Sequence, residues 1–128
     1  MQLTQQSTPA PAQNLPAGDN TMVTGPMGDC VSVVVLWNPD GNGQYQNVRG
    51  YHGSGGFQAI NLNSLFNAVP NVAATRVIGF FTTQSSSSND RQRFQDYCAA
   101  NIANAVRTIA QGGGNYRVDR NGVWAIQQ

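Results

Sequence analysis

The chain has 128 residues and a formal net charge of +1 at pH 7, and 10% of its residues are charged. A chain of this length forms one domain with a single modest core. Its weak, balanced charge lacks the basic surface that binds phosphate backbones or anionic lipids. Nucleic acids and membrane surfaces are therefore not expected partners. No apolar run reaches the roughly 20 residues of a membrane-spanning helix.

Residues 1–20 are rich in Gln, Pro and Ala and show no hydrophobic period. This composition predicts a disordered leader, followed by a single folded domain over residues 21–128. The leader lacks the basic start and the apolar core of a signal peptide. The polar surface comes mainly from amide and hydroxyl residues, which is typical of a secreted or translocated protein. If the protein leaves its cell, it therefore does so by another route, or the chain is a fragment of a larger protein.

The segment from Cys30 to Trp37 is nearly all apolar and rich in β-branched residues, which predicts a central strand covered on both faces. Residues 38–44 are dense in turn formers and predict a hairpin loop that leads into a second strand over residues 45–52. Alternation along that strand places His52 on the same face as Val48. The hairpin should therefore bring His52 back to the start of the first strand.

Further along, apolar spacing over residues 60–69 predicts a short helix, and residues 75–83 predict a second buried strand. A longer helix is expected from Asn89 or Asp90 to about Gln111, with Phe94, Cys98, Ile102, Ala105, Val106 and Ile109 on one stripe. Residues 116–118 and 123–126 should form a closing hairpin. The prediction is an α/β (α+β) fold with mostly antiparallel sheets of five to six strands and two helices.

The segment TGPMGDCV, residues 24–31, delivers a cysteine to the first residue of a buried strand. Gly25 and Gly28 allow backbone conformations in which successive N–H groups converge beside the sulfur, as an oxyanion hole requires. A thiol needs a base to become a nucleophile at neutral pH, and His52 is the only histidine. Cys30 can equally be a small buried hydrophobe and His52 a structural residue.

The combination of Thr24, Gly28, Cys30, the following apolar strand and His52 resembles the cysteine–histidine protein glutamine deamidases. This superfamily includes the chemotaxis receptor deamidases and the cytotoxic necrotizing factor type of bacterial toxin. In the chemotaxis deamidases a threonine lies six residues before the nucleophile, which is the interval from Thr24 to Cys30. Here Asp29 replaces the small residue common before the cysteine, the interval to His52 is longer, and GSGGF follows His52.

The resemblance implies a deamidase-toxin-like sandwich and a catalytic domain over residues 21–128. It implies Cys30 as nucleophile, His52 as acid and base, Thr24 as the residue that orients the imidazole, and Gly28, Asp29 and Cys30 as the oxyanion turn. The expected reaction is hydrolysis of a glutamine carboxamide through a thioester, with no cofactor and no metal. The expected partner is a protein that presents a glutamine, attacked by a monomeric bacterial effector or toxin.

Several alternatives stay open at this stage. The same thioester could lead to transamidation or peptide hydrolysis, or the chain could be a chemotaxis-type receptor deamidase in the bacterial cytoplasm. In a different class, a Cys30–Cys98 disulfide would indicate a secreted, non-enzymatic binding domain. Cys98 falls on the apolar stripe of the expected long helix, which favours a buried structural thiol. Asp90 and Asp96 are explained by their positions in the first turns of that helix.

Overall fold

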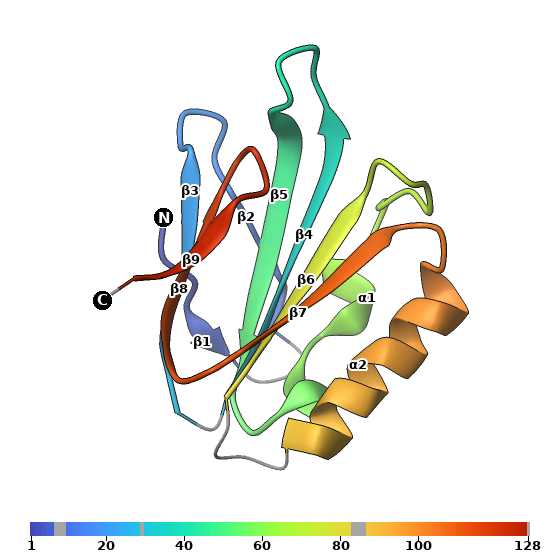
Figure 1. Cartoon of the computed structure of the whole chain (residues 1–128). Helices are drawn as coiled ribbons and strands as arrows, with labels where there is room; N and C mark the ends of the chain where they lie inside the picture. The colour runs from blue at the N-terminus through green and yellow to red at the C-terminus, as the bar shows by residue number, and fades with distance from the viewer. Residues whose placement is uncertain (7–9, 29, 83–86, 128) are drawn as a thin grey trace.

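The computed structural model describes residues 1–6, 10–28, 30–82 and 87–127. Within these residues the fold is α+β and rich in strands, with a six-stranded mixed sheet, a three-stranded antiparallel sheet and two helices. The two sheets face each other, and both helices lie on the outer side of the larger sheet (Figure 1). The predicted fold class is therefore confirmed. None of the described helices is both long and apolar enough to cross a bilayer.

The elements follow one another along the chain with these bounds: β1 Gln5–Gln6, β2 Gln13–Asn14, β3 Thr21–Met27, β4 Val31–Pro39, β5 Tyr45–Gly53, η1 Phe57–Ala59, α1 Leu62–Leu65, β6 Arg76–Phe81, α2 Ser87–Asn101, β7 Val106–Gln111, β8 Gly114–Asp119 and β9 Trp124–Gln127. The larger sheet has the order β1-β5-β4-β6-β7, with β2 also paired to β5, and the smaller sheet has the order β3-β8-β9. The predicted central strand, hairpin partner, second buried strand, short helix and closing hairpin all have counterparts.

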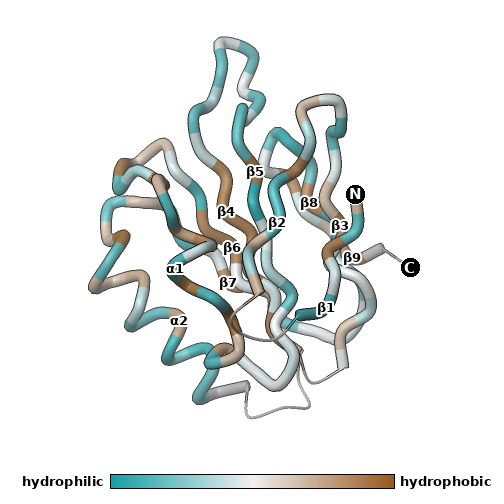
Figure 2. The backbone as a smooth tube through the Cα atoms, turned by 180° about the vertical axis from the view of Figure 1, so that it is seen from behind, coloured by the Kyte–Doolittle hydropathy of each residue, from teal (hydrophilic) through white to brown (hydrophobic). Residues whose placement is uncertain are grey.

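Strand β4 lies in the middle of the larger sheet and separates two hydrophobic cores. One set of its alternating side chains, including Val33 and Val35, packs with Phe94 and Cys98 of α2. The other set, including Val34, packs against the smaller sheet. The most hydrophobic backbone segments lie along β4 and β6 between these layers (Figure 2). Any side chain on β4 therefore faces either the helices or the second sheet.

The beginning of the chain differs from the disordered leader expected from its composition. Leu3 and Leu15 are buried in the core between the sheets. The N–H of Leu3 donates to the carbonyl of Val23 at 2.8 Å, and the N–H of Ser54 donates to the carbonyl of Gln6 at 2.9 Å. Two apolar anchors and edge-strand hydrogen bonds hold this segment. Neither feature produces a hydrophobic period in the sequence.

The predicted helix to Gln111 is wrong in its second half, because α2 ends at Asn101. Its stripe residues Phe94, Cys98 and Ile102 are buried as expected. From Val106 onward the chain instead forms β7, which pairs parallel with β6. The β-branched residues of this segment fit a strand as well as a helix, and pairing with the exposed edge of β6 decides between them.

Arg120 is a buried cation that joins the start of β5 to the chain before β3. Its guanidinium donates to the carbonyls of Pro16, Asp19, Tyr45 and Gln46 at 2.8–3.1 Å. We expect Arg120→Met to lower the free energy of unfolding by roughly 3 kcal/mol, since several buried carbonyls lose a charged donor.

Denaturant unfolding of the Arg120→Met variant measures this loss. The matched control is Arg117→Met, which removes only a partly exposed ion pair to Asp119 at 3.4 Å. That variant should change the free energy of unfolding by less than about 1 kcal/mol. Equal losses in the two variants would contradict the role assigned to Arg120.

Candidate functional site

The register of three neighbouring strands brings polar residues into one row. His52 of β5 pairs with Ser32 of β4 and with Gln5 of β1. Paired residues in a sheet project to the same face, here the face toward the smaller sheet. Cys30 precedes Ser32 by two residues and is therefore a diagonal neighbour of His52 on that face. The predicted return of His52 to the start of the Cys30 strand is confirmed by this register.

The imidazole of His52 is held by one hydrogen bond and leaves its second nitrogen unpartnered. Nδ1 donates to the main-chain carbonyl of Thr24 at 2.7 Å. This bond fixes the neutral tautomer with its lone pair on Nε2. Nε2 is buried and makes no hydrogen bond. Burial lowers the pKa of His52 below its usual value, an effect larger than the opposing effect of the Thr24 carbonyl. The ring is therefore neutral at pH 7 and carries a free lone pair on Nε2.

Thr24 contributes to the imidazole through its main chain rather than its hydroxyl. The Thr24 Oγ1 accepts a hydrogen bond from the N–H of Tyr116 at 3.0 Å and donates to the carbonyl of Gly25 at 2.8 Å. The hydroxyl therefore ties β3 to β8, while the carbonyl orients His52. The structure brings together Thr24 and His52 as the sequence analysis expected, by an atom that every residue type carries.

The predicted oxyanion turn is only partly visible. Gly25 has the expected positive φ of 86°, but its N–H donates to Oδ1 of Asn115 at 3.0 Å and is not available to a substrate. Gly28 is exposed and does not have a positive φ. Asp29 lies outside the described residues. The expected convergence of the Gly25 and Gly28 amides beside the sulfur is therefore wrong for Gly25.

Cys30 lies beneath the side chain of Gln5. The cysteine is 7% exposed, and Nε2 of Gln5 donates to its Sγ at 3.4 Å. Gln5 itself is exposed, so a surface glutamine covers the buried thiol. Strand β1, which carries Gln5, has only two residues and pairs with the end of β5 (Figure 1).

Ser32 belongs to the same cluster, although the sequence analysis did not select it. It is fully buried, and its Oγ has no hydrogen-bond partner. An unpartnered buried hydroxyl costs about 1–3 kcal/mol, so this register pair, Ser32 and His52, holds two unsatisfied buried polar atoms. The one polar residue inside the apolar run CVSVVVLW was the signal that could have identified it.

The two cysteines lie in different environments. Cys98 is 1% exposed within the core beneath α2, and burial raises the pKa of its thiol to about 11. Cys30 continues the alternation of Ser32 and faces the other side of the sheet. No disulfide joins them. The two thiols are separated by the full thickness of β4, which a disulfide cannot bridge.

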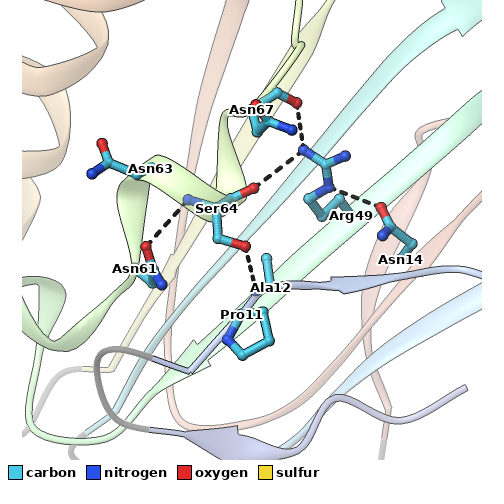
Figure 3. A pocket seen from close by; sticks show the side chains of 8 residues that line it. All are labelled: Pro11, Ala12, Asn14, Arg49, Asn61, Asn63, Ser64 and Asn67. Atoms are coloured by element: carbon cyan, nitrogen blue, oxygen red, sulfur yellow. Dashed lines mark hydrogen bonds between the residues drawn. The ribbon is translucent and has the colours of Figure 1, made fainter.

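A separate hollow of about 660 Å³ lies between residues 11–14, Arg49 and the start of α1 (Figure 3). Its polar groups already bond to one another: Nε of Arg49 donates to Asn14 at 2.8 Å, and Oγ of Ser64 accepts from the N–H of Ala12 at 2.8 Å. Arg49 is an odd-numbered residue of β5 and so faces away from His52. These hydrogen bonds around the hollow hold residues 11–14 against β5 and α1, and the hollow shares no residue with the Cys30 cluster.

Substitution of Gly25 tests how strictly the Thr24 carbonyl is held. A Cβ at Gly25 would lie 3.2 Å from Nε2 of Gln2 and 3.7 Å from Nδ1 of His52, at a φ of 86° that disfavours alanine. We expect Gly25→Ala to lower stability by about 1–2 kcal/mol and to disturb the imidazole. Thermal unfolding measures the first effect and the histidine NMR shifts the second. Gly18→Ala is the control, because that position has open space and no positive φ.

Comparison with models of protein families, with curated proteins and with solved structures finds no match. Among the described residues no group of three or more His, Cys, Asp or Glu side chains is arranged to hold a metal ion. The site itself consists of the thiol of Cys30, the oriented imidazole of His52, the buried hydroxyl of Ser32 and the carboxamide of Gln5, all on one face of the sheet.

Proposed function

We propose that the protein is a cysteine-dependent amide hydrolase that converts glutamine side chains of a target protein to glutamate. The observation that carries the proposal is the state of His52. Its Nδ1 is fixed by the Thr24 carbonyl at 2.7 Å, while its buried Nε2 has no partner on the face it shares with Cys30. A base held in one orientation, with a free lone pair on the face of the sheet that also carries a thiol, is the arrangement from which nucleophilic catalysis by cysteine can start.

In the proposed reaction, Nε2 of His52 takes the proton of the Cys30 thiol as Sγ attacks the carboxamide carbon. The carbon–nitrogen bond then breaks, and His52 returns the proton to the leaving ammonia. Water attacks the resulting thioester, again with His52 as base, and the carbon–sulfur bond breaks to release glutamate and the thiol. Glutamine and water thus give glutamate and ammonia, without a cofactor. As a bacterial effector or toxin, a protein of this kind would act on a partner that carries a glutamine.

Amide hydrolysis in water enriched in ¹⁸O tests this proposal. Benzyloxycarbonyl-Gln-Gly and unfolded β-casein serve as probes, and ammonia release is compared with the mass gain of the glutamine peptides. We expect one heavy oxygen for each ammonia released, a gain of about 3 Da per site. Transfer of the acyl group to an amine would instead release ammonia without oxygen incorporation. Absence of both products on both probes would overturn the proposal.

A further inference from the structure

Gln5 places a glutamine carboxamide against the thiol that is proposed to act on glutamine. Its Nε2 lies 3.4 Å from Sγ of Cys30, so the carboxamide carbon bonded to that nitrogen is within about 5 Å of the sulfur. Gln5 is also the β1 residue that pairs with His52. One side chain of the protein is therefore held next to both the nucleophile and the base.

We propose that Gln5 is a substrate built into the chain: Cys30 converts its carboxamide to a carboxylate, and this conversion uncovers the thiol. The proposal rests on the proposed function and names a first substrate for it. The step has the same balance as above: Sγ replaces the amide nitrogen at the carboxamide carbon, His52 protonates the leaving ammonia, and water then replaces Sγ. In the net change, the carboxamide of Gln5 and one water give a side-chain carboxylate and ammonia.

The chemistry of the product explains the uncovering. A carboxamide nitrogen donates a hydrogen bond to sulfur, whereas an ionised carboxylate only accepts. The N–H···S hydrogen bond at 3.4 Å from Gln5 to Cys30 is therefore lost when the carboxamide becomes a carboxylate, and the carboxylate repels the thiolate form of Cys30. Because Gln5 is exposed, the new carboxylate can turn into solvent. The chain contains no lysine, so a thioester at Gln5 has no lysine of its own chain to react with, and hydrolysis follows.

Four glutamines near the start of the chain provide an internal comparison. Cleavage before Asp19 releases residues 1–18, which contain Gln2, Gln5, Gln6 and Gln13. Tandem mass spectrometry of this peptide locates each gain of about 1 Da. We expect conversion of Gln5 in the intact protein, from purification onward, to exceed that of the other three by roughly tenfold or more. Conversion should cease in Cys30→Ala and, as a second and milder variant, in His52→Asn.

A second readout measures the cover directly, as the rate at which iodoacetamide alkylates Cys30 in the folded protein. In the His52→Asn background, where Gln5 is expected to stay a carboxamide, Gln5→Ala should raise this rate roughly tenfold, because the thiol becomes accessible. Gln6→Ala is the matched control: Gln6 is the adjacent residue of β1, and strand alternation directs its side chain to the opposite face. That control should leave the rate unchanged.

The outcomes separate this inference from the proposed function. If the glutamine probes are hydrolysed while Gln5 converts no faster than Gln6, the built-in substrate is wrong and the proposed function stands. If Gln5 converts equally in Cys30→Ala, the conversion is spontaneous and the inference is overturned. If neither Gln5 nor the probes react, both proposals fail together. Conversion confined to Gln5 and dependent on both Cys30 and His52 supports both.

Discussion

Cys30→Ser will lower the rate of glutamine hydrolysis by about 10³-fold or more, while the fold stays intact. The serine hydroxyl is far less acidic than a thiol, so neutral His52 cannot generate an effective nucleophile from it. The buried position, 7% exposed, accepts the slightly smaller side chain without a change of shape. Ammonia release from the glutamine probes measures the loss, and circular dichroism checks the fold.

Cys98→Ala is the matched control for that experiment. Cys98 lies in the opposite core, and burial raises the pKa of its thiol to about 11, which keeps it protonated at neutral pH. Its removal should cost about 1 kcal/mol of stability and leave hydrolysis unchanged. A Cys30→Ser protein that keeps its activity, or a Cys98→Ala protein that loses it, would place the nucleophile elsewhere.

His52→Asn will lower hydrolysis by about 10²- to 10⁴-fold. The asparagine amide nitrogen can still donate to the Thr24 carbonyl, where Nδ1 donates at 2.7 Å, but the base at Nε2 is gone. This variant therefore removes the proton acceptor but keeps the hydrogen bond from the side chain at position 52 to the Thr24 carbonyl. Steady-state rates on the glutamine probes measure the effect, which should fall mainly on kcat. Ser32→Ala is the control for the neighbouring buried hydroxyl. Loss of hydrolysis in this variant would indicate Ser32 as the nucleophile, whereas retained hydrolysis agrees with Cys30.

The acidic limb of the rate profile provides a test of the same residue without mutation. Burial lowers the pKa of His52 below its usual value of 6.5, so the unprotonated base persists to lower pH than in a free histidine. We expect hydrolysis to decline only below pH 6.5. The unfolded chain binds a proton on His52 more readily than the folded chain does. The contribution of neutral His52 to the free energy of unfolding is therefore fully present above pH 6.5, and it is lost as the pH falls through the folded pKa. A decline centred above pH 6.5 would contradict this environment for the ring.

The placement of Cys30 and His52 on one face of the sheet could be predicted because it depends on local rules. A run of β-branched residues, a dense turn and the two-residue alternation of a hairpin together fix which side chains share a face. The central position of β4 followed from the same run, since a strand that is apolar on both faces must be covered on both. These features need no knowledge of the rest of the chain.

The remaining features depend on contacts between distant segments. The Thr24 carbonyl that holds His52 is a backbone atom and leaves no mark in the sequence. Gln5 reaches the site because a two-residue strand pairs with the end of β5, which the polar composition of residues 1–20 does not indicate. The change from helix to strand at Val106 likewise depends on the free edge of β6. Local pattern therefore predicts that Cys30 and His52 share a face, whereas long-range pairing supplies the residues that surround them.

The most direct test of the proposed action of His52 on Cys30 is the rate of Cys30 alkylation by iodoacetamide, measured by peptide mass in the folded protein from pH 5 to 9. The Gln5→Ala chain, with the thiol uncovered, is compared with the Gln5→Ala, His52→Asn double variant, and Cys98 serves as the unreactive internal reference. We predict that Cys30 in the first protein reacts near neutral pH and that loss of His52 slows this reaction by roughly tenfold or more. Equal rates in the two proteins, or a Cys30 as inert as Cys98, would contradict it.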